Sequence, residues 1–294
     1  MPECVACGGS ALRPHLRVAG EAGPQGLIPT TDQFGTALSD IVRCTACGHM
    51  QLEVFPSEER LSEAYGEAAS EDSLAEEEGQ RETARRLLER VEGRTARGTL
   101  LDLGCWTGFL LDEARWRGWK VLGVEPSEFA FSFAIETLGL EVRHAGLADV
   151  ELPADHFQAV VMADVIEHLI DPGAALDRVS ATLAPGGVLC LVLPDAGSRV
   201  ARVLGPRWWS VIPTHVHYFT RRSLATLLRR HGFEVREVAT APKVFSVGYY
   251  LQRTAGYSPP LGRALVTGAR RAGLSERLWA PDFRDRMLVI AAPR

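Results

Sequence analysis

Residues 100–110 read LLDLGCWTGFL, an apolar run followed by a turn that contains two glycines. The run 100–103 predicts a buried strand, and the residues after Gly108 predict the start of a helix. A glycine-containing turn between a strand and a helix is a common ligand site, because backbone groups and the helix N-terminus meet there. The stretch therefore predicts an α/β sheet with a ligand at the end of its first strand.

The remainder of the chain extends this pattern. Short apolar runs at 120–125, 141–144, 158–162 and 188–193 alternate with helical patterns, and two late strands are expected at 233–239 and 285–291. Asp171-Pro172 predicts a helix start, and Thr220 is expected to cap a helix that ends at Gly232. The alternation predicts a Rossmann-like, doubly wound sheet of seven strands.

The spacing in the turn and two nearby acids indicate the kind of ligand. A dinucleotide site would need glycines at 104, 106 and 109, but 106 is tryptophan and 109 is phenylalanine. The Asp102 carboxylate would repel a pyrophosphate and suits a ligand with positive charge. Glu125, at the end of the next strand, is placed to accept hydrogen bonds from a ribose diol. We therefore predict a cationic nucleoside.

Four of the six cysteines lie near the N-terminus in two C-x-x-C pairs, each followed by glycine: Cys4, Cys7, Cys44 and Cys47. The pairs predict a tetrahedral four-thiolate zinc site with a structural role. A pair of disulfides is the alternative, and a reducing compartment favours zinc. His15 and His49 are expected at the surface and not among the ligands.

We predict three regions: a zinc ribbon at 1–55, a helical bridge or lid at 56–95, and an α/β domain at 96–294. The second helix of the bridge begins with Ser73 and Glu76 in capping-box spacing. Its apolar stripe is expected to pack on the main domain or to cover the ligand, and comprises Leu74, Leu87, Leu88 and Val91.

Composition and charge narrow the possible partners. The chain has no apolar run of about 20 residues, so we expect no membrane span, and its N-terminus has no signal-peptide pattern, so we expect a cytoplasmic protein. The net charge is -5, yet residues 199–294 hold 17 basic and 5 acidic residues. This region faces an anion or is simply a solvated basic surface. Arg199, Arg202 and Arg207 are the best placed to meet an anionic group.

Four segments occur in the order and spacing of a known family: LLDLGCWTGFL, VLGVEPS, HAGLADVELPADHFQAVVMADVIEHLIDP and LAPGGVLCLVLPD. Over residues 95–294 the chain resembles the class I S-adenosylmethionine-dependent methyltransferases. The CVACG and RCTACGH ribbon resembles that of bacterial methyltransferases that act on sugars and other small metabolites. The resemblance implies a donor held around Gly104, Cys105 and Gly108, ribose on Glu125 beside Pro126, adenine near Leu147 and Ala148, and Asp164 lining the site.

Trp106 departs from the family, which has a small residue at this position. An indole fits there if its dihedral angles stay in an ordinary region, because its Cβ then needs only to point away from the ligand. We expect the ring to lie over the methionine end of the cofactor or against the N-terminal part of the chain, outside the pocket. Loss of cofactor binding is the alternative.

Methyl transfer needs alignment of acceptor, methyl and sulfur, and an oxygen or carbon acceptor also needs a base. The resemblance places Glu167 and His168 in the active site, and His215 and His217 in a segment that reaches over the acceptor. The alternatives are that Glu167 and His168 support local structure or the adenine side, and that His215 and His217 pair with the backbone. Trp208 and Trp209 either stack on the acceptor or belong to the core.

Segment 261–279 predicts a basic amphipathic helix. We expect it to be an insertion that packs on the sheet between the last two strands, with membrane docking as the alternative.

The leading functional hypothesis is O-methylation of a sugar, a glycoside or a biosynthetic intermediate, including anionic and carrier-tethered acceptors. N-methylation of an amino sugar and C-methylation of a nucleotide-linked sugar are alternatives; for the latter, the related enzymes have a further C-terminal domain that we do not expect here. An RNA methyltransferase, with the ribbon gripping nucleic acid, and a non-catalytic binding protein are hypotheses of other classes. The ribbon is not basic, so we do not expect nucleic acid as a partner.

Overall fold

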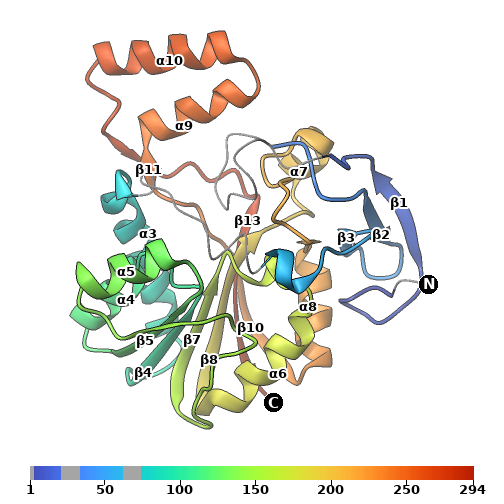
Figure 1. Ribbon diagram of the computed structural model, residues 1–294, viewed down its shortest axis with the longest axis vertical. Coiled ribbons are helices and arrows are strands. Elements are labelled where there is room, and N and C mark those ends of the chain that lie inside the picture. Colours follow the sequence, from blue (N-terminus) through green and yellow to red (C-terminus); the bar gives the residue numbers. More distant parts are fainter. Residues whose placement is uncertain (1–2, 21–33, 62–73) are drawn as a thin grey trace.

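The computed structural model describes residues 3–20, 34–61 and 74–294. Its largest element is a seven-stranded sheet in the order β10-β13-β8-β7-β4-β5-β6 (Figure 1). The strands are β4 (Thr99–Leu103), β5 (Lys120–Glu125), β6 (Val142–His144), β7 (Phe157–Ala163), β8 (Leu183–Pro194), β10 (Phe233–Thr240) and β13 (Arg286–Pro293). All seven predicted strands are present. Only β13 runs antiparallel to its neighbours β8 and β10.

Helices cover both faces of this sheet, as the doubly wound prediction requires. One face packs against α3 (Glu77–Glu92), α4 (Phe109–Trp116) and α5 (Glu128–Glu136). The other face packs against α6 (Pro172–Thr182) and α8 (Arg221–Arg230). Alternate residues of each strand enter opposite clusters: in β7, Val161 faces the first group of helices and Val160 the second.

The predicted helix signals hold in most cases. The Asp171 side chain accepts from the Ala174 amide, and Thr220 forms a capping box with Ser223. The predicted bridge helix is present as α3 and begins at Glu77, and the Glu76 carboxylate accepts hydrogen bonds from the amide and hydroxyl of Ser246. Ser73 lies outside the described residues. Leu87, Leu88 and Val91 do pack on the sheet.

The cysteine-containing part forms a second, antiparallel sheet in the order β1-β2-β3-β9. Its strands are β1 (Leu12–Leu16), β2 (Ile41–Cys44), β3 (Met50–Leu52) and β9 (His217–Tyr218). The last strand comes from the α/β domain, and it pairs Met50 with Tyr218. The ribbon is therefore joined to the larger domain through a shared sheet.

An insertion between β10 and β13 contains β11 (Phe245–Ser246), α9 (Val247–Arg253), α10 (Pro259–Arg271) and β12 (Leu278–Trp279). The expectation that the basic segment packs on the sheet is wrong: α10 packs against α9, and both helices project beyond the end of the sheet (Figure 1). A further short helix, α7 (Arg199–Leu204), follows β8. Three single turns of 3-10 helix complete the described elements: Ile166–His168, Gly205–Arg207 and Thr254–Gly256.

Candidate active site

A cavity of about 2150 Å³ lies at the carboxyl ends of the parallel strands. This edge of an open α/β sheet is where such folds bind ligands. Most of the predicted site residues line it: Asp102, Gly104, Cys105, Trp106, Glu125, Pro126, Leu147, Ala148, Asp164, His168 and His215. Gly108 is not among the lining residues and caps α4 instead.

The turn after β4 needs both of its glycines. Gly104 and Gly108 have φ of +72° and +82°, a region that favours glycine. A Cβ at Gly104 would lie 2.7 Å from Val165 Cγ2, because the turn packs against the loop after β7. The amides of Gly104 and Cys105 both donate to the Val124 carbonyl. These two amides are therefore committed to the protein, which suits a positively charged ligand better than an anion.

Trp106 has φ of +48°, so the expectation of an ordinary backbone conformation at this position is wrong. Its amide donates to Glu125 Oε2 over 2.7 Å, and this hydrogen bond ties the turn to the end of β5. Its ring lies 6.3 Å from the ring of Phe129 in α5. Trp106 is one of the residues that line the cavity, and the position of its ring over the methionine end of the cofactor stays a prediction.

Two buried carboxyl groups face the turn. Glu125 Oε1 accepts from the Ser127 amide, and burial raises the pKa of Glu125. Asp102 is 3% exposed, and its Oδ1 has no hydrogen-bond partner among the described residues. Burial, and then the charge of Glu125, raise the pKa of Asp102 to about 8. A cationic ligand would compensate this carboxylate, so the residues present fit the predicted cofactor.

Asp164, at the end of β7, adopts φ of +59° and lies between two cations. Its Oδ2 is 2.6 Å from Lys243 Nζ, and its Oδ1 accepts from Arg286. Burial would raise the pKa of Asp164, but Arg286 and Lys243 outweigh it and hold that pKa well below its usual range. The carboxylate is thus committed to a charged cluster on the wall of the cavity.

His168 and His215 come together although 47 positions separate them. Nδ1 of His168 is 2.9 Å from the Thr214 carbonyl oxygen, and Nδ1 of His215 is 2.8 Å from that of Ser210. A carbonyl can only accept, so each Nδ1 carries hydrogen. Burial lowers the pKa of both rings, that of His168 to about 4. Each ring is therefore neutral with an unprotonated Nε2, and the two rings meet edge to face at 4.6 Å.

Glu167 completes this cluster. Burial, and then the charge of Asp164, raise its pKa to about 8. Neither of its carboxylate oxygens has a hydrogen-bond partner within the described part of the chain. Its oxygen and one nitrogen each of His168 and His215 lie within 4.8 Å of one another. The three groups can relay a proton, and they are also of the types that hold a divalent cation.

His217 does not belong to this site. It lies in β9, buried against the ribbon, with its Nδ1 3.3 Å from His49 Nε2 and its ring against Phe55 and Phe219. It does not line the cavity, so the structure gives no support to a catalytic role. His49 is fully buried, and the expectation that it lies at the surface is wrong. His15 is exposed as expected.

The arginines expected to meet an anionic group are placed elsewhere. None of Arg199, Arg202 and Arg207 lines the cavity, and Arg207 lies over the ring of Tyr257. The two tryptophans differ: Trp208 is buried and donates to Asp285, whereas Trp209 lines the cavity.

Sequence reasoning missed the residues that the insertion and the start of β13 add to the cavity. Lys243, one of only two lysines in the chain, and Arg286 provide the cations. An aromatic wall comes from the same region and consists of Phe245, Tyr249, Tyr250 and Trp279. Phe245 stacks on Tyr249 at 4.2 Å, and Tyr250 meets Trp279 at 5.5 Å. The rarity of lysine was the only sequence signal.

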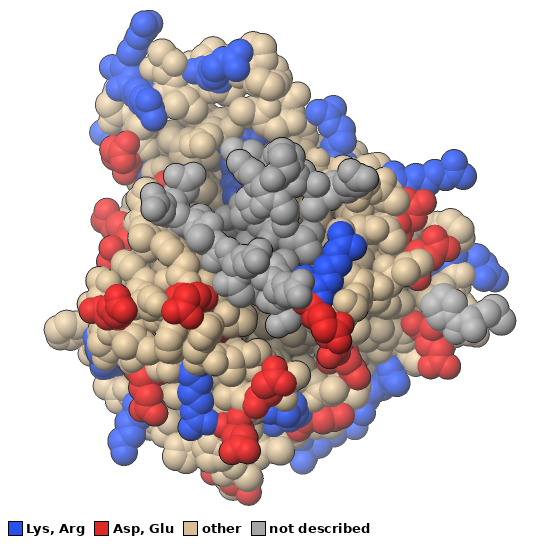
Figure 2. All heavy atoms as spheres, in the orientation of Figure 1, with Lys and Arg blue, Asp and Glu red and all other residues tan. Residues whose placement is uncertain are grey.

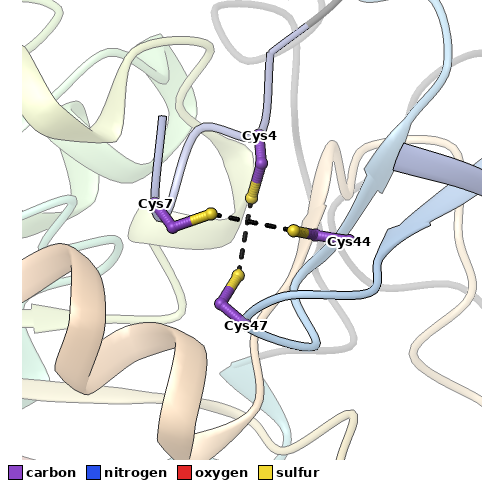
Figure 3. A group of neighbouring side chains, drawn as sticks. All are labelled: Cys4, Cys7, Cys44 and Cys47. Carbon is purple, nitrogen blue, oxygen red and sulfur yellow. Dashed lines mark hydrogen bonds between the residues drawn. The ribbon is translucent and has the colours of Figure 1, made fainter. Parts of the chain in front are cut away.

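The four cysteines of the ribbon converge from its two knuckles (Figure 3). Sγ of Cys4 is 3.5 Å from that of Cys47, and Sγ of Cys7 is 3.7 Å from that of Cys44. A tetrahedron with zinc–sulfur bonds of about 2.3 Å separates sulfurs by about 3.8 Å, whereas a disulfide needs about 2.05 Å. The spacing, and the pairing across the knuckles, fit a metal and not two disulfides.

The comparisons with known proteins agree with this geometry. A family model described as a methyltransferase domain matches residues 76–238, more than half of the chain. The chain belongs to this family. With its seven-stranded sheet it is a member of the class I S-adenosylmethionine-dependent methyltransferases.

The individual relatives of this methyltransferase differ in the atom they methylate. The ubiquinone biosynthesis O-methyltransferase of Nitrobacter winogradskyi is 34% identical over 155 residues, which are 47% of this chain and 57% of that protein. The C-methyltransferase NovU of Streptomyces niveus is 30% identical over 207 residues, 69% of this chain and 48% of that protein. The chain thus spans about half the length of these relatives.

Among solved structures, a possible histamine N-methyltransferase of Thermotoga maritima aligns with a TM-score of 0.49 and 19% identity, covering 74% of this chain and 91% of that one.

Proposed function

We propose that this methyltransferase transfers the methyl group of S-adenosylmethionine to a hydroxyl oxygen of a small molecule, with the His168, His215 and Glu167 cluster accepting the hydroxyl proton. One observation carries the proposal: two buried histidines on the cavity wall both donate Nδ1–H to backbone carbonyls. These contacts orient each ring and make Nε2 the atom that would accept the proton.

The donor would be held by residues that the structure brings to one side of the cavity. Asp102 would meet the ammonium group, and Glu125 would accept from the ribose hydroxyls while its bonds to the Trp106 and Ser127 amides keep it in place. Leu147 and Ala148 would border the adenine. The bound cofactor supplies a methyl group made electrophilic by the sulfonium.

The proton of the acceptor would move to Nε2 of His168 or His215 as the oxygen attacks. The imidazolium that results gains a counter-charge from Asp164, which remains ionised beside Lys243 and Arg286. Once ionised, Glu167 would add a second negative charge within 4.8 Å. Alignment and exclusion of water supply the remainder of the catalysis, because methyl transfer from a sulfonium disperses charge.

Lys243 and Arg286 indicate the charge of the acceptor. They bring two positive charges to the single carboxylate of Asp164, so this wall favours an acceptor that carries a negative charge. The aromatic wall of Phe245, Tyr249, Tyr250 and Trp279 suits a ring, whether a sugar or an aromatic nucleus. An anionic sugar, a glycoside or a biosynthetic intermediate, free or tethered to a carrier, meets both conditions. The ubiquinone relatives are O-methyltransferases by name, which supports oxygen as the acceptor atom.

N- and C-methylation of a sugar are the alternatives, and the name of NovU supports carbon. An RNA acceptor has less support. On the face shown in Figure 2, basic and acidic side chains of the described residues are interspersed and do not form one long basic stripe. We also propose that Cys4, Cys7, Cys44 and Cys47 bind a structural zinc ion.

The test uses a donor with an isotopically labelled methyl group and a panel of catechols, hydroxylated aryl acids, amino sugars and nucleotide sugars. The expected product carries the label on oxygen, as read by NMR, and label on nitrogen or carbon would overturn the O-methyl proposal. His168→Gln should lower kcat by about 10²- to 10⁴-fold with unchanged affinity for S-adenosylhomocysteine. His156→Gln, at an exposed position, is the control and should have no effect.

A further inference from the structure

The α9–α10 hairpin has an unusual concentration of exposed apolar side chains. Among the described residues, eleven large hydrophobic side chains are exposed, and six of them fall between positions 261 and 283: Leu261, Leu265, Leu274, Leu278, Trp279 and Phe283. Leu261 is 53% exposed and Trp279 is 48% exposed. Single exposed hydrophobic residues are ordinary, but six within 23 positions of one insertion indicate a contact surface.

The apolar residues of α10 lie on one flank of the helix. Leu261 and Leu265 are one turn apart, so they share a face, while Arg263 and Arg270 lie two turns apart on another. The side of α10 that contacts α9 and the 3-10 turn Thr254–Gly256 is made by small residues, and it buries Gly262 and Ala269. A Cβ at Gly262 would lie 2.7 Å from the Ala255 amide nitrogen. Leu261, Leu265 and Arg263 are therefore left exposed.

The hairpin is also the most basic part of a chain that is acidic overall. Residues 247–279 contain five arginines and one glutamate, a net charge of +4, against -5 for the whole chain. Figure 2 shows basic side chains along the outer edge of the hairpin at the top of the view. Leucines flanked by arginines on a short helix are typical of elements that lie in the interface of an anionic bilayer.

The hairpin is continuous with the cavity. Val266 and Arg270 of α10, Tyr249 of α9 and Trp279 of β12 all line it. A surface that bound to the outer side of this hairpin would therefore lie close to the wall of the acceptor site. Within the described residues, no helix is long and apolar enough to cross a membrane.

We propose that the α9–α10 hairpin docks on the surface of an anionic lipid bilayer, with Leu261 and Leu265 entering the interface and the arginines contacting lipid phosphates. The charge selects this occupant over a second copy of the chain, because two +4 surfaces repel each other across a symmetric contact. It is also selected over nucleic acid, whose phosphates would leave the leucines exposed to water. Docking brings the cavity to an acceptor that partitions into the membrane.

Co-sedimentation of the full-length protein with vesicles tests this. Vesicles of equal parts phosphatidylglycerol and phosphatidylcholine should retain the protein, and vesicles of phosphatidylcholine alone should retain at least about tenfold less. Leu261→Asp/Leu265→Asp should reduce partitioning to anionic vesicles at least about tenfold. Arg263→Glu/Arg271→Glu should abolish the preference for phosphatidylglycerol, and about 1 M salt should weaken it.

Matched controls lie outside the insertion. Val203→Asp and Trp116→Ser replace side chains that are 84% and 81% exposed, and they should leave vesicle binding unchanged. All variants should keep the wild-type affinity for S-adenosylhomocysteine, which excludes misfolding. Equal retention by both kinds of vesicle, no retention, or a dimer that the double leucine variant converts to a monomer would each overturn the proposal. None of these readouts depends on the identity of the acceptor.

Discussion

The donor side and the acceptor side of the cavity are built from the chain in different ways. The donor side comes from one continuous stretch, residues 102–148, in which each contact lies within a strand–turn–helix unit or between neighbouring strands. The acceptor side combines the loop after β7, the segment 209–215, the insertion and the start of β13. The donor side can therefore be predicted from a local sequence pattern. The acceptor side cannot, because its residues come together only when the sheet has formed.

The two sides also differ in electrostatics. On the donor side, burial raises the pKa of Asp102 and Glu125, and among the described residues neither carboxylate pairs with a lysine or an arginine. On the acceptor side, Asp164 is neutralised by Lys243 and Arg286 within the protein. A buried carboxylate without a counter-charge favours a cationic ligand, and a site with more cations than carboxylates favours an anionic ligand. The two sides of one cavity therefore differ in the net charge of their buried side chains, and this difference indicates which ligand each side binds.

The largest expected effect is that loss of the ribbon metal impairs the acceptor side of the cavity and spares the donor side. Removing the zinc ion proposed at Cys4, Cys7, Cys44 and Cys47 should unfold the ribbon, since structural zinc sites contribute about 10 kcal/mol or more. The strand β9 would lose β3, and His215 lies two residues before β9. We expect methyl transfer to be lost while affinity for S-adenosylhomocysteine changes less than about threefold.

Chelation followed by calorimetry measures this, with zinc per chain determined by atomic absorption and Cys190→Ala as the control for a buried cysteine outside the cluster. A parallel loss of cofactor affinity would mean that the two sides do not form separate units. A chain purified without stoichiometric metal would remove the premise.

A second prediction concerns Gly104, where the turn of the donor side contacts Val165 in the loop after β7. Gly104→Val introduces a β-branched residue at φ of +72° and a Cβ 2.7 Å from Val165 Cγ2, so the turn and the loop carrying Asp164 must both move. We expect at least about a hundredfold loss of affinity for S-adenosylhomocysteine, measured by titration calorimetry, or about 2.7 kcal/mol. Gly118→Val is the matched control, because Gly118 has φ of +90° but no neighbour within 4 Å. If both variants lost affinity equally, backbone strain would explain the effect and contact with the acceptor loop would not.

These residues show which parts of the fold and of the candidate site can be predicted from the sequence. The seven strands, the two glycines, Asp102 and Glu125 were all predictable, because each depends on neighbours in the chain. Trp106 was predicted in an ordinary conformation because nothing local shows that its amide reaches Glu125 Oε2. His217 was predicted beside His215 in the active site. Its strand β9 pairs with the ribbon strand β3, and its side chain contacts His49 of the ribbon. Lys243 and Arg286 carry no motif, since their role arises only from meeting Asp164.

The pH dependence of stability sharpens the electrostatic part of the comparison. Burial and Asp164 raise the pKa of Glu167 to about 8, above its ordinary value near 4.5. Between about pH 5 and pH 8 the folded chain therefore binds more protons than the unfolded chain, and the free energy of unfolding should fall as the pH rises. Glu167→Gln should remove up to about 4 kcal/mol of this fall.

Urea unfolding at pH 5.5 and at pH 8 provides the measurement. Glu141→Gln, at an exposed position before β6, is the control and should keep the wild-type dependence. An identical pH dependence in Glu167→Gln and wild type would show that Glu167 is already ionised at neutral pH, and the proton relay would then need another acceptor.

The smallest expected effect concerns Trp106, the residue at which the donor side departs most from its local pattern. Its φ of +48° costs a residue with a side chain about 1–2 kcal/mol, whereas glycine adopts it freely. Trp106→Gly and Trp106→Val both lose the ring contact with Phe129, but only valine retains the backbone cost and adds a β-branch. The glycine variant should therefore be more stable than the valine variant by about 1–2 kcal/mol in urea unfolding. Equal stabilities would mean that the turn relaxes to an ordinary conformation in solution, and the hydrogen bond from the Trp106 amide to Glu125 would then not define the ribose side of the site.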